Sequence, residues 1–241
     1  MKSSAMQAAV ETTDLTNSAE RRQTMVDCQI RTFDVTDQRL IARFLAVPRE
    51  RFVPLEGRDV AYSDVGLTIK SEADGAEGRY LLPPLVLARL IQGGRIGSID
   101  RVLDVACGAG YSTAILAGIA AEVVALEEPA VAPELEERLA SLDRGQVRIV
   151  RGKLEDGVLG GAPYDVILIN GAIEAGLEPL LDQLAEGGRL LAIRRNAADP
   201  TGLAAKAMCF EKRGAEIGTR YLFDAAAPVL RAFARTPAFS F

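Results

Sequence analysis

The stretch VLDVACGAGYST, residues 102–113, decides the fold. It begins with apolar residues typical of a buried strand, passes through a turn that contains Gly108 and Gly110, and continues into a helical pattern. A strand, a glycine-rich turn and a helix in this order often hold a nucleotide-like ligand where the helix begins. The residues of the turn must then distinguish ligands that carry phosphate from ligands that do not.

Strands and helices alternate after this turn. The predicted strands cover residues 101–106, 122–127, 146–150, 164–170 and 189–193, and the predicted helices between them cover about 111–120, 131–142 and 176–185. The alternation predicts an α/β fold with a mostly parallel central sheet and helices on both faces. A further pair of strands is expected around Gly214.

Three helices are predicted before the first of these strands. The first is expected to have Ser18 as its N-cap, and the second, DQRLIARFLA (37–46), to have Thr36. The third, LVLARLIQ (85–92), follows two prolines and ends at two glycines. Residues 57–80 contain many Gly, Ser, Asp and Glu residues, which predicts an irregular connection.

The length of the chain, 241 residues, suits one α/β domain. We expect residues 1–16 to be disordered or loosely held and residues 17–241 to form a single domain. Within it, residues 17–95 are expected to form an N-terminal helical cap, and residues 96–241 a ligand-binding core.

Composition excludes several classes of function. The chain has no histidine, so Ser-His-Asp and Cys-His nucleophiles and histidine-ligated metals are excluded, and we predict no metal site. Its three cysteines are widely spaced, which indicates reduced thiols. The net charge of −5, without a block of Lys and Arg, argues against a nucleic-acid partner. The polar start and the absence of a long apolar run argue against a membrane and favour a cytoplasmic protein.

Three ligands compete for the glycine-rich turn. A phosphate-binding P-loop needs a Lys after its glycines, and none follows here. A dinucleotide fingerprint needs a third glycine where this chain has Thr113. S-adenosyl-L-methionine remains, because methyltransferases of the Rossmann-like class carry an acidic residue followed by a turn of small residues. Asp104 and Ala106, followed by the two glycines, fit that pattern.

Glu127 supports this interpretation, because it ends the next predicted strand, where a carboxylate can accept hydrogen bonds from ribose hydroxyls. Asn170 ends the fourth strand at the same edge of the sheet. The spacing of Glu127 also suits a dinucleotide, so that residue alone leaves both ligands open. The full set of predicted cofactor-binding residues is Asp104, Ala106, Gly108, Gly110, Tyr111, Glu127, Glu128, Lys153, Leu154 and Asn170.

Most of residues 25–195 resembles the protein-L-isoaspartate O-methyltransferases. The most specific segments are VPRERFVP (47–54) and AYSDVGLTI (61–69), and PYDVILINGA (163–172) and LLDQLAEGGRLL (180–191) match later strand regions. The resemblance implies a Rossmann-like methyltransferase. Such an enzyme transfers a methyl group from S-adenosyl-L-methionine to the free carboxyl of an isoaspartyl protein or peptide, as part of protein repair, and leaves S-adenosyl-L-homocysteine.

The chain departs from the family at two places. The family motif GQTISQP aligns with GRYLLPP (78–84), which puts Leu82 in place of the family serine and Tyr80 in place of the threonine. After the third strand, Lys153 replaces an Asp that helps to hold the adenine in the family. A leucine side chain makes no hydrogen bond, and a lysine cannot accept one. We therefore assign no catalytic residue.

The substrate-binding residues predicted from the resemblance are Tyr62, Asp64, Tyr80, Leu82 and Arg194. Arg79, Arg194 and Arg195 are cations that could face an acceptor carboxylate, although any one of them is more often a surface arginine. An acceptor carboxylate is already ionised at neutral pH and needs no base, which suits a chain without histidine. Two alternatives stay open: a methyltransferase that acts on a small molecule or another protein group, and a protein that binds the cofactor without turnover.

Overall fold

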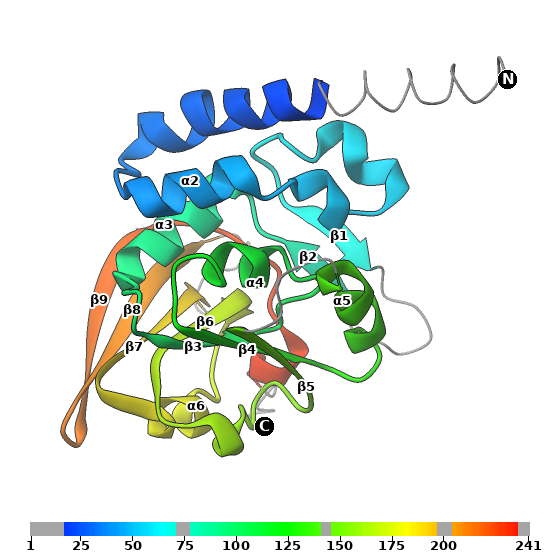
Figure 1. Ribbon diagram of the computed structural model, residues 1–241. Helices are drawn as coiled ribbons and strands as arrows, with labels where there is room; N and C mark the ends of the chain where they lie inside the picture. Colours follow the sequence, from blue (N-terminus) through cyan, green and yellow to red (C-terminus); the bar gives the residue numbers. More distant parts are fainter. Residues whose placement is uncertain (1–16, 71–77, 141–145, 197–203, 236–241) are drawn as a thin grey trace, which may run out of the picture.

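The computed structural model describes residues 17–70, 78–140, 146–196 and 204–235 (Figure 1). The predicted loose segment, 1–16, lies outside these residues. A seven-stranded sheet forms the centre of the molecule, in the order β5-β4-β3-β6-β7-β8-β9. Its strands are β3 (Arg101–Val105), β4 (Glu122–Glu127), β5 (Val147–Arg151), β6 (Tyr164–Ile173), β7 (Leu184–Arg195), β8 (Ala205–Arg213) and β9 (Glu216–Asp224).

The strands from β5 to β7 are all parallel, whereas β7, β8 and β9 form an antiparallel meander. The prediction of a mostly parallel α/β sheet is confirmed, and so is the strand pair around Gly214. Because β3 is parallel to both of its neighbours, the carboxyl ends of β3, β4 and β6 meet at one edge of the sheet, where α/β proteins bind ligands.

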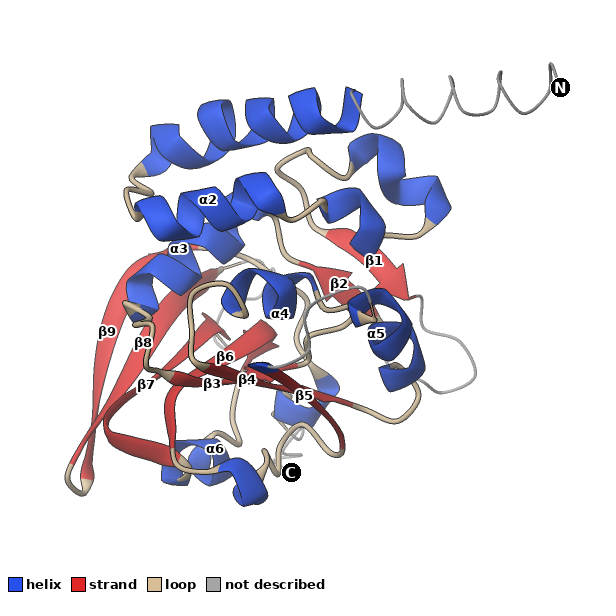
Figure 2. Cartoon of the chain, viewed as in Figure 1, coloured by secondary structure: helices blue, strands red, loops and turns tan. Residues whose placement is uncertain are grey.

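Apolar layers cover both faces of the sheet, with helices on each (Figure 2). Successive residues of β4 and β6 enter opposite layers: Val123 and Val166 face the layer of the N-terminal helices, and Val124 and Ile167 face the other. After a first helix that includes residues 17–25, the helices are α2 (Gln38–Ala46), α3 (Pro84–Gly94), α4 (Tyr111–Leu116), α5 (Ala132–Leu139) and α6 (Glu178–Asp182). Shorter 3-10 or π turns are η1 (Val26–Ile30), η2 (Arg31–Phe33), η3 (Arg49–Phe52), η4 (Leu55–Val60), η6 (Leu159–Gly161) and η7 (Arg231–Phe233).

Two predicted N-caps are wrong. Ser18 lies inside the first helix, which already includes residue 17. Asp37, rather than Thr36, caps α2, because its carboxylate accepts from the backbone N–H groups of Arg39 and Leu40. The backbone N–H of Thr36 instead donates to the side chain of Gln92 in α3, over 2.7 Å.

The prediction of an irregular connection over 57–80 is also wrong in part. This region contains η4 and a two-stranded antiparallel hairpin, β1 (Leu67–Lys70) and β2 (Arg79–Leu81). Strands of three and four residues carry too little alternation to stand out among polar neighbours. The residues between the two strands, 71–77, lie outside the described part of the chain.

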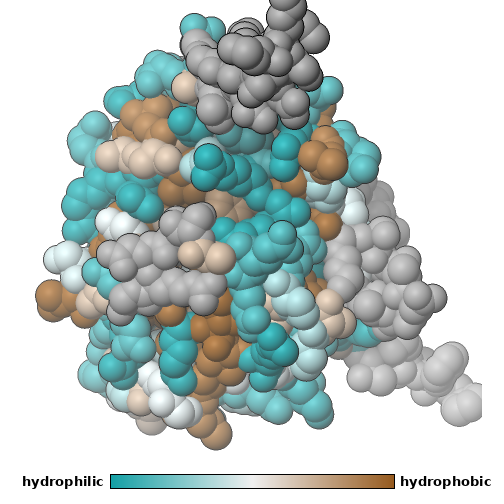
Figure 3. Space-filling view, turned by 45° about the vertical axis from the view of Figure 1, so that its right-hand side comes forward, coloured by the Kyte–Doolittle hydropathy of each residue, from teal (hydrophilic) through white to brown (hydrophobic). Residues whose placement is uncertain are grey.

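No described helix is long and apolar enough to cross a membrane. The large apolar side chains that are exposed, such as Leu55, Ile99 and Leu159, come from separate elements. Figure 3 shows a mosaic of hydrophilic and apolar residues on one face. Dispersed residues of this kind are ordinary for a protein surface.

The cap of α2 gives a first prediction. Asp37→Ala should lower the free energy of unfolding in urea by about 1 kcal/mol, because two backbone N–H groups lose their acceptor. Thr36→Ala is the matched control and should change the free energy of unfolding by less than about 0.5 kcal/mol, since Thr36 contributes its backbone rather than its hydroxyl. Equal losses in both variants would contradict the assignment of the cap.

Candidate functional site

The glycine-rich turn between β3 and α4 has an unusual backbone. Ala106, Gly108 and Gly110 have φ angles of 55°, 58° and 92°, in the left-handed region. A Cβ atom on Gly110 would lie 2.7 Å from Leu135 Cδ1, so only glycine fits there. Cys107, between these residues, is buried, and burial raises the pKa of its thiol well above its ordinary value. It therefore acts as a small buried side chain rather than as a nucleophile.

Asp104 is buried beneath this turn. Its carboxylate accepts hydrogen bonds from the hydroxyls of Ser112 (2.8 Å) and Thr113 (2.6 Å) in α4 and from the amide of Asn170 in β6 (2.7 Å). Burial raises the pKa of Asp104 to about 6, although these three donors lower it. Asp104 thus joins β3, α4 and β6 and holds the start of the helix in place.

Glu127 is fully buried at the end of β4 and faces the turn. Its Oε2 accepts from the backbone N–H of Gly108 (2.8 Å), and its Oε1 accepts from the N–H of Glu128 (2.8 Å) and from Nε of Arg79 (2.9 Å). Nη2 of Arg79 reaches Glu128 Oε2 over 2.7 Å. Burial raises the pKa of Glu127, and Arg79 and the two N–H groups oppose that rise.

The hairpin β1–β2 brings Arg79 to this place. Ile69 of β1 packs directly on the turn, since a Cβ atom on Gly108 would lie 2.4 Å from Ile69 Cδ1 and 3.9 Å from Arg79 Cβ. Arg79 itself is only 1% exposed. The carboxyl edge of β3 and β4 is therefore covered by side chains of the hairpin.

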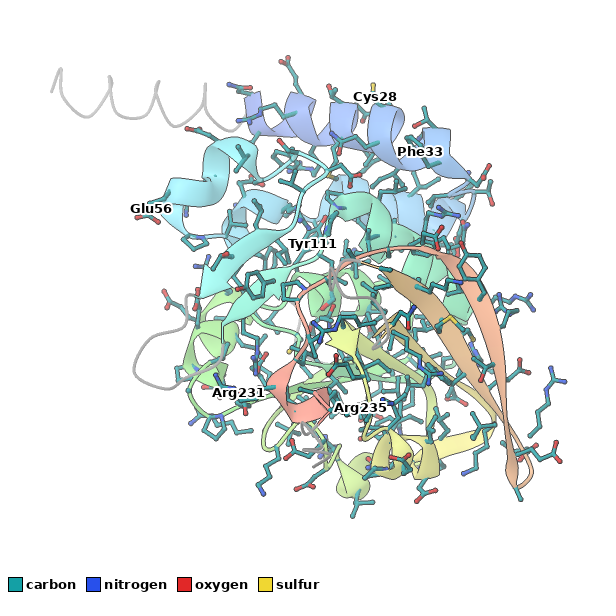
Figure 4. The ribbon with its side chains drawn as sticks, turned by 180° about the vertical axis from the view of Figure 1, so that it is seen from behind. Cys28, Phe33, Glu56, Tyr111, Arg231 and Arg235 are labelled. Carbon is teal, nitrogen blue, oxygen red and sulfur yellow. The ribbon has the colours of Figure 1, made fainter. Side chains whose placement is uncertain are left out.

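The other predicted cofactor residues lie further from this carboxylate cluster. Tyr111 is fully buried between the N-terminal helices and the sheet (Figure 4), where its ring contacts Phe44, Phe52 and Arg49. Lys153 is exposed after β5, and Leu154 is buried in the apolar layer on the α6 side of the sheet. Their proposed contact with a cofactor stays a prediction.

Arg49 organises the segment that carries Leu82. This fully buried arginine, in the stretch VPRERFVP, donates from Nε to the carbonyl of Ala61 and from Nη2 to the carbonyl of Leu82, both over 2.7 Å. Burial lowers its pKa, and its guanidinium lies 4.9 Å from the centre of the Tyr111 ring. The segments 47–54, 61–69 and 78–84 thus meet at one buried side chain.

The predicted substrate-binding residues do not form one cluster. Tyr62 donates its hydroxyl to Glu50 within the N-terminal cap, and burial raises its pKa. The Asp64 carboxylate accepts from the N–H of Leu85 at the start of α3 (3.1 Å). Tyr80 is half-buried in β2, Leu82 is buried just after it, and Arg194 is exposed near the end of β7.

Arg194 borders a separate hollow at the carboxyl ends of β6 and β7. This cavity has a volume of about 460 Å³ and is lined by Arg194, Arg195, Lys206 and Arg235, together with Glu174. Nε of Arg195 donates to Glu174 Oε1 over 2.7 Å. Cations outnumber carboxylates among these side chains, so the cavity favours an anionic ligand.

Comparisons with known proteins match this architecture. The family model for protein-L-isoaspartate(D-aspartate) O-methyltransferase matches residues 20–209. The chain belongs to this family. The protein-L-isoaspartate O-methyltransferase of Methanoculleus marisnigri is 38% identical over 172 residues, which cover 71% of this chain and 76% of the relative. Protein-L-isoaspartate O-methyltransferase 1 of Rhodopseudomonas palustris is 36% identical over 179 residues, or 74% of this chain and 71% of the relative.

Solved structures of isoaspartate methyltransferases have the same fold. One superposes with a TM-score of 0.74 at 23% identity, over 87% of this chain and 65% of the other, so the chain spans just under two thirds of that structure's length. A second, from Plasmodium falciparum and in complex with S-adenosyl-L-homocysteine, gives a TM-score of 0.67 at 16% identity, over 89% of this chain and 98% of the other.

The residues of the turn fit the S-adenosylmethionine that this methyltransferase family uses. The left-handed backbone at Gly108 and Gly110 leaves a cradle without side chains of its own, and Glu127 aims a carboxylate at it. These residues would hold the adenosine part, and the cofactor would supply an activated methyl group. In the structure, Ile69 packs against Gly108, and Arg79 donates a hydrogen bond to the Glu127 carboxylate.

Three residues of this candidate site were not assigned their contacts from the sequence. Ser112 and Thr113 were not recognised as partners of Asp104, although two hydroxyls directly after the glycines were a usable signal. Arg79 was considered for the acceptor carboxylate, whereas the structure pairs it with Glu127 and Glu128. The signal for that contact was Arg79 itself, a cation that replaces the first glutamine of GQTISQP.

Asp104 gives a prediction on pH. Its pKa of about 6 in the folded chain lies above the value of about 4 for an unfolded aspartate, so the folded state binds the proton more tightly. Its contribution to stability is present below about pH 4 and is lost as the pH rises through about 6. The free energy of unfolding of the wild type, relative to Asp104→Asn, should therefore fall by about 2 kcal/mol between about pH 4 and pH 7. Urea titrations at both pH values measure it, and a difference independent of pH would refute the assignment.

Proposed function

We propose that this chain transfers the methyl group of S-adenosylmethionine to the carboxylate of an isoaspartyl residue in a protein or peptide. The observation that carries the proposal is the Glu127 carboxylate, 2.8 Å from the backbone N–H of Gly108, in a chain that matches the family model over residues 20–209. A carboxylate at this strand end is the group that accepts hydrogen bonds from ribose hydroxyls in related α/β sites.

The protein's part in this reaction is to position the reactants and to exclude water. The acceptor carboxylate is ionised at neutral pH, so no protein base has to remove a proton. Asp104 is occupied by three hydrogen-bond donors, and the raised pKa of Tyr62 keeps its hydroxyl neutral at physiological pH. Alignment of the acceptor and replacement of its water shell remain as the sources of rate enhancement.

Two features define the acceptor side in this proposal. Leu82 supplies an apolar wall, and the hydrogen bond from Arg49 to its carbonyl fixes the backbone at this point. The cavity lined by Arg194, Arg195 and Lys206 lies at the carboxyl edge of the same sheet and supplies positive charge for an acidic peptide. The cytoplasmic location expected from the sequence is part of this proposal, as is the absence of a nucleic-acid partner.

A methyl-transfer assay tests the proposal. With methyl-labelled S-adenosylmethionine at high concentration, the protein should form a base-labile methyl ester on an isoaspartyl peptide and none on the same peptide with an ordinary aspartate. The peptide with an ordinary aspartate is therefore the control for non-specific labelling. Absence of transfer to the isoaspartyl peptide by folded protein would reject the activity.

Leu82 allows a sharper test of the acceptor side. Leu82→Ser restores the family hydroxyl and should raise kcat/KM for the isoaspartyl peptide about tenfold, the effect of one added hydrogen bond to a charged group. Leu85→Ser, the same change at the second residue of α3, is the control and should not raise it. A kcat/KM that is unchanged in Leu82→Ser would show that Leu82 does not border the acceptor.

A further inference from the structure

The side chain of Arg79 bridges two carboxylates at the place where the proposed cofactor would bind. Its Nε lies 2.9 Å from Glu127 Oε1, and its Nη2 lies 2.7 Å from Glu128 Oε2. Arg79 is 1% exposed and Glu127 is fully buried, so water screens this part of the contact little. The pair is therefore a defined, low-dielectric interaction rather than a surface contact.

The carboxylate of Glu127 has little capacity left for a ribose. Oε1 already accepts from Arg79 and from the N–H of Glu128, and Oε2 accepts from the N–H of Gly108. A carboxylate has about four acceptor sites, whereas two ribose hydroxyls require two of them in suitable directions. Cδ1 of Ile69 also lies only 2.4 Å from where a Cβ of Gly108 would be, so the hairpin fills the open side of the turn.

We propose that Arg79 competes with the cofactor ribose for Glu127 and thereby sets the cofactor affinity of this chain. The inference rests on the proposed function, because it takes S-adenosylmethionine as the ligand of the glycine-rich turn. Binding requires Arg79 to leave Oε1 of Glu127, so the apparent dissociation constant is the intrinsic one divided by the fraction of molecules in which Arg79 has left.

The opposite end of the same two strands offers a matched control. Nε of Arg101 in β3 lies 2.9 Å from Glu122 Oε2 in β4, at the amino edge of the sheet. Arg101→Gln and Arg79→Gln remove the same charge. Arg101→Gln breaks one partly exposed ion pair with β4, whereas Arg79→Gln breaks the ion pairs with Glu127 and Glu128. They differ in position relative to the glycine-rich turn, so a general effect of net charge appears in both variants.

Calorimetric titration with S-adenosyl-L-homocysteine tests the inference without relying on activity. This ligand lacks the sulfonium charge, so long-range attraction to the freed carboxylates contributes little. We expect Arg79→Gln to lower its dissociation constant at least tenfold, Arg79→Lys to lower it less, and Arg101→Gln to leave it within about twofold. In the background of Glu127→Gln, the gain from Arg79→Gln should disappear, because the competition requires this carboxylate.

Thermal unfolding separates competition from a purely structural role. Arg79→Gln leaves Glu127 without its cation, so its Tm without ligand should fall, and its rise on adding S-adenosyl-L-homocysteine should exceed that of the wild type. An unchanged or larger dissociation constant in Arg79→Gln, with tight binding by the wild type, would overturn the inference alone. No binding by the wild type or by Arg79→Gln would overturn the proposed function as well.

Discussion

The site depends on one buried carboxylate, that of Glu127. It ties the amide of the glycine-rich turn to the end of β4 and to the arginine of the β1–β2 hairpin. A carboxylate in this position without donors would cost several kcal/mol, so the donors from the turn, the strand end and the hairpin all stabilise the buried charge. A two-stranded hairpin is marginal by itself, and the ion pair with the packing of Ile69 on Gly108 holds it against the core.

Two other buried polar side chains, Asp104 and Arg49, also join separate elements through hydrogen bonds. Asp104 fixes the start of α4 to β3 and β6, whereas Arg49 fixes the segments around Ala61 and Leu82 to each other and lies against the ring of Tyr111. The N-terminal cap is therefore part of the site rather than an added layer. Because Arg49 is fully buried and bonds to the carbonyls of Ala61 and Leu82, it constrains the backbone on both sides of the β1–β2 hairpin.

The sequence predicted the core of this structure well, because local patterns determine it. The strand expected at 122–127 is β4 to the residue, and the turn at Gly108 and Gly110 has the left-handed backbone that small residues allow. The β1–β2 hairpin escaped prediction because its strands are short and are stabilised by distant residues. Arg79 meets Glu127 across 48 positions, and a charged residue gives no local sign that it will be buried. The start of α2 was misjudged by one residue, since two adjacent side chains were both good caps.

After the antiparallel strands β7, β8 and β9, the chain returns to β6. Val229 forms a bridge with Ala172, the N–H of Leu230 bonds to the carbonyl of Ala172, and the N–H of Arg235 reaches the carboxylate of Glu174 over 2.8 Å. This late segment thus forms one wall of the cationic cavity, while the glycine-rich turn lies on strands made much earlier in the chain. In order of synthesis, the residues of the glycine-rich turn therefore precede those of this wall, which follow all seven strands of the sheet.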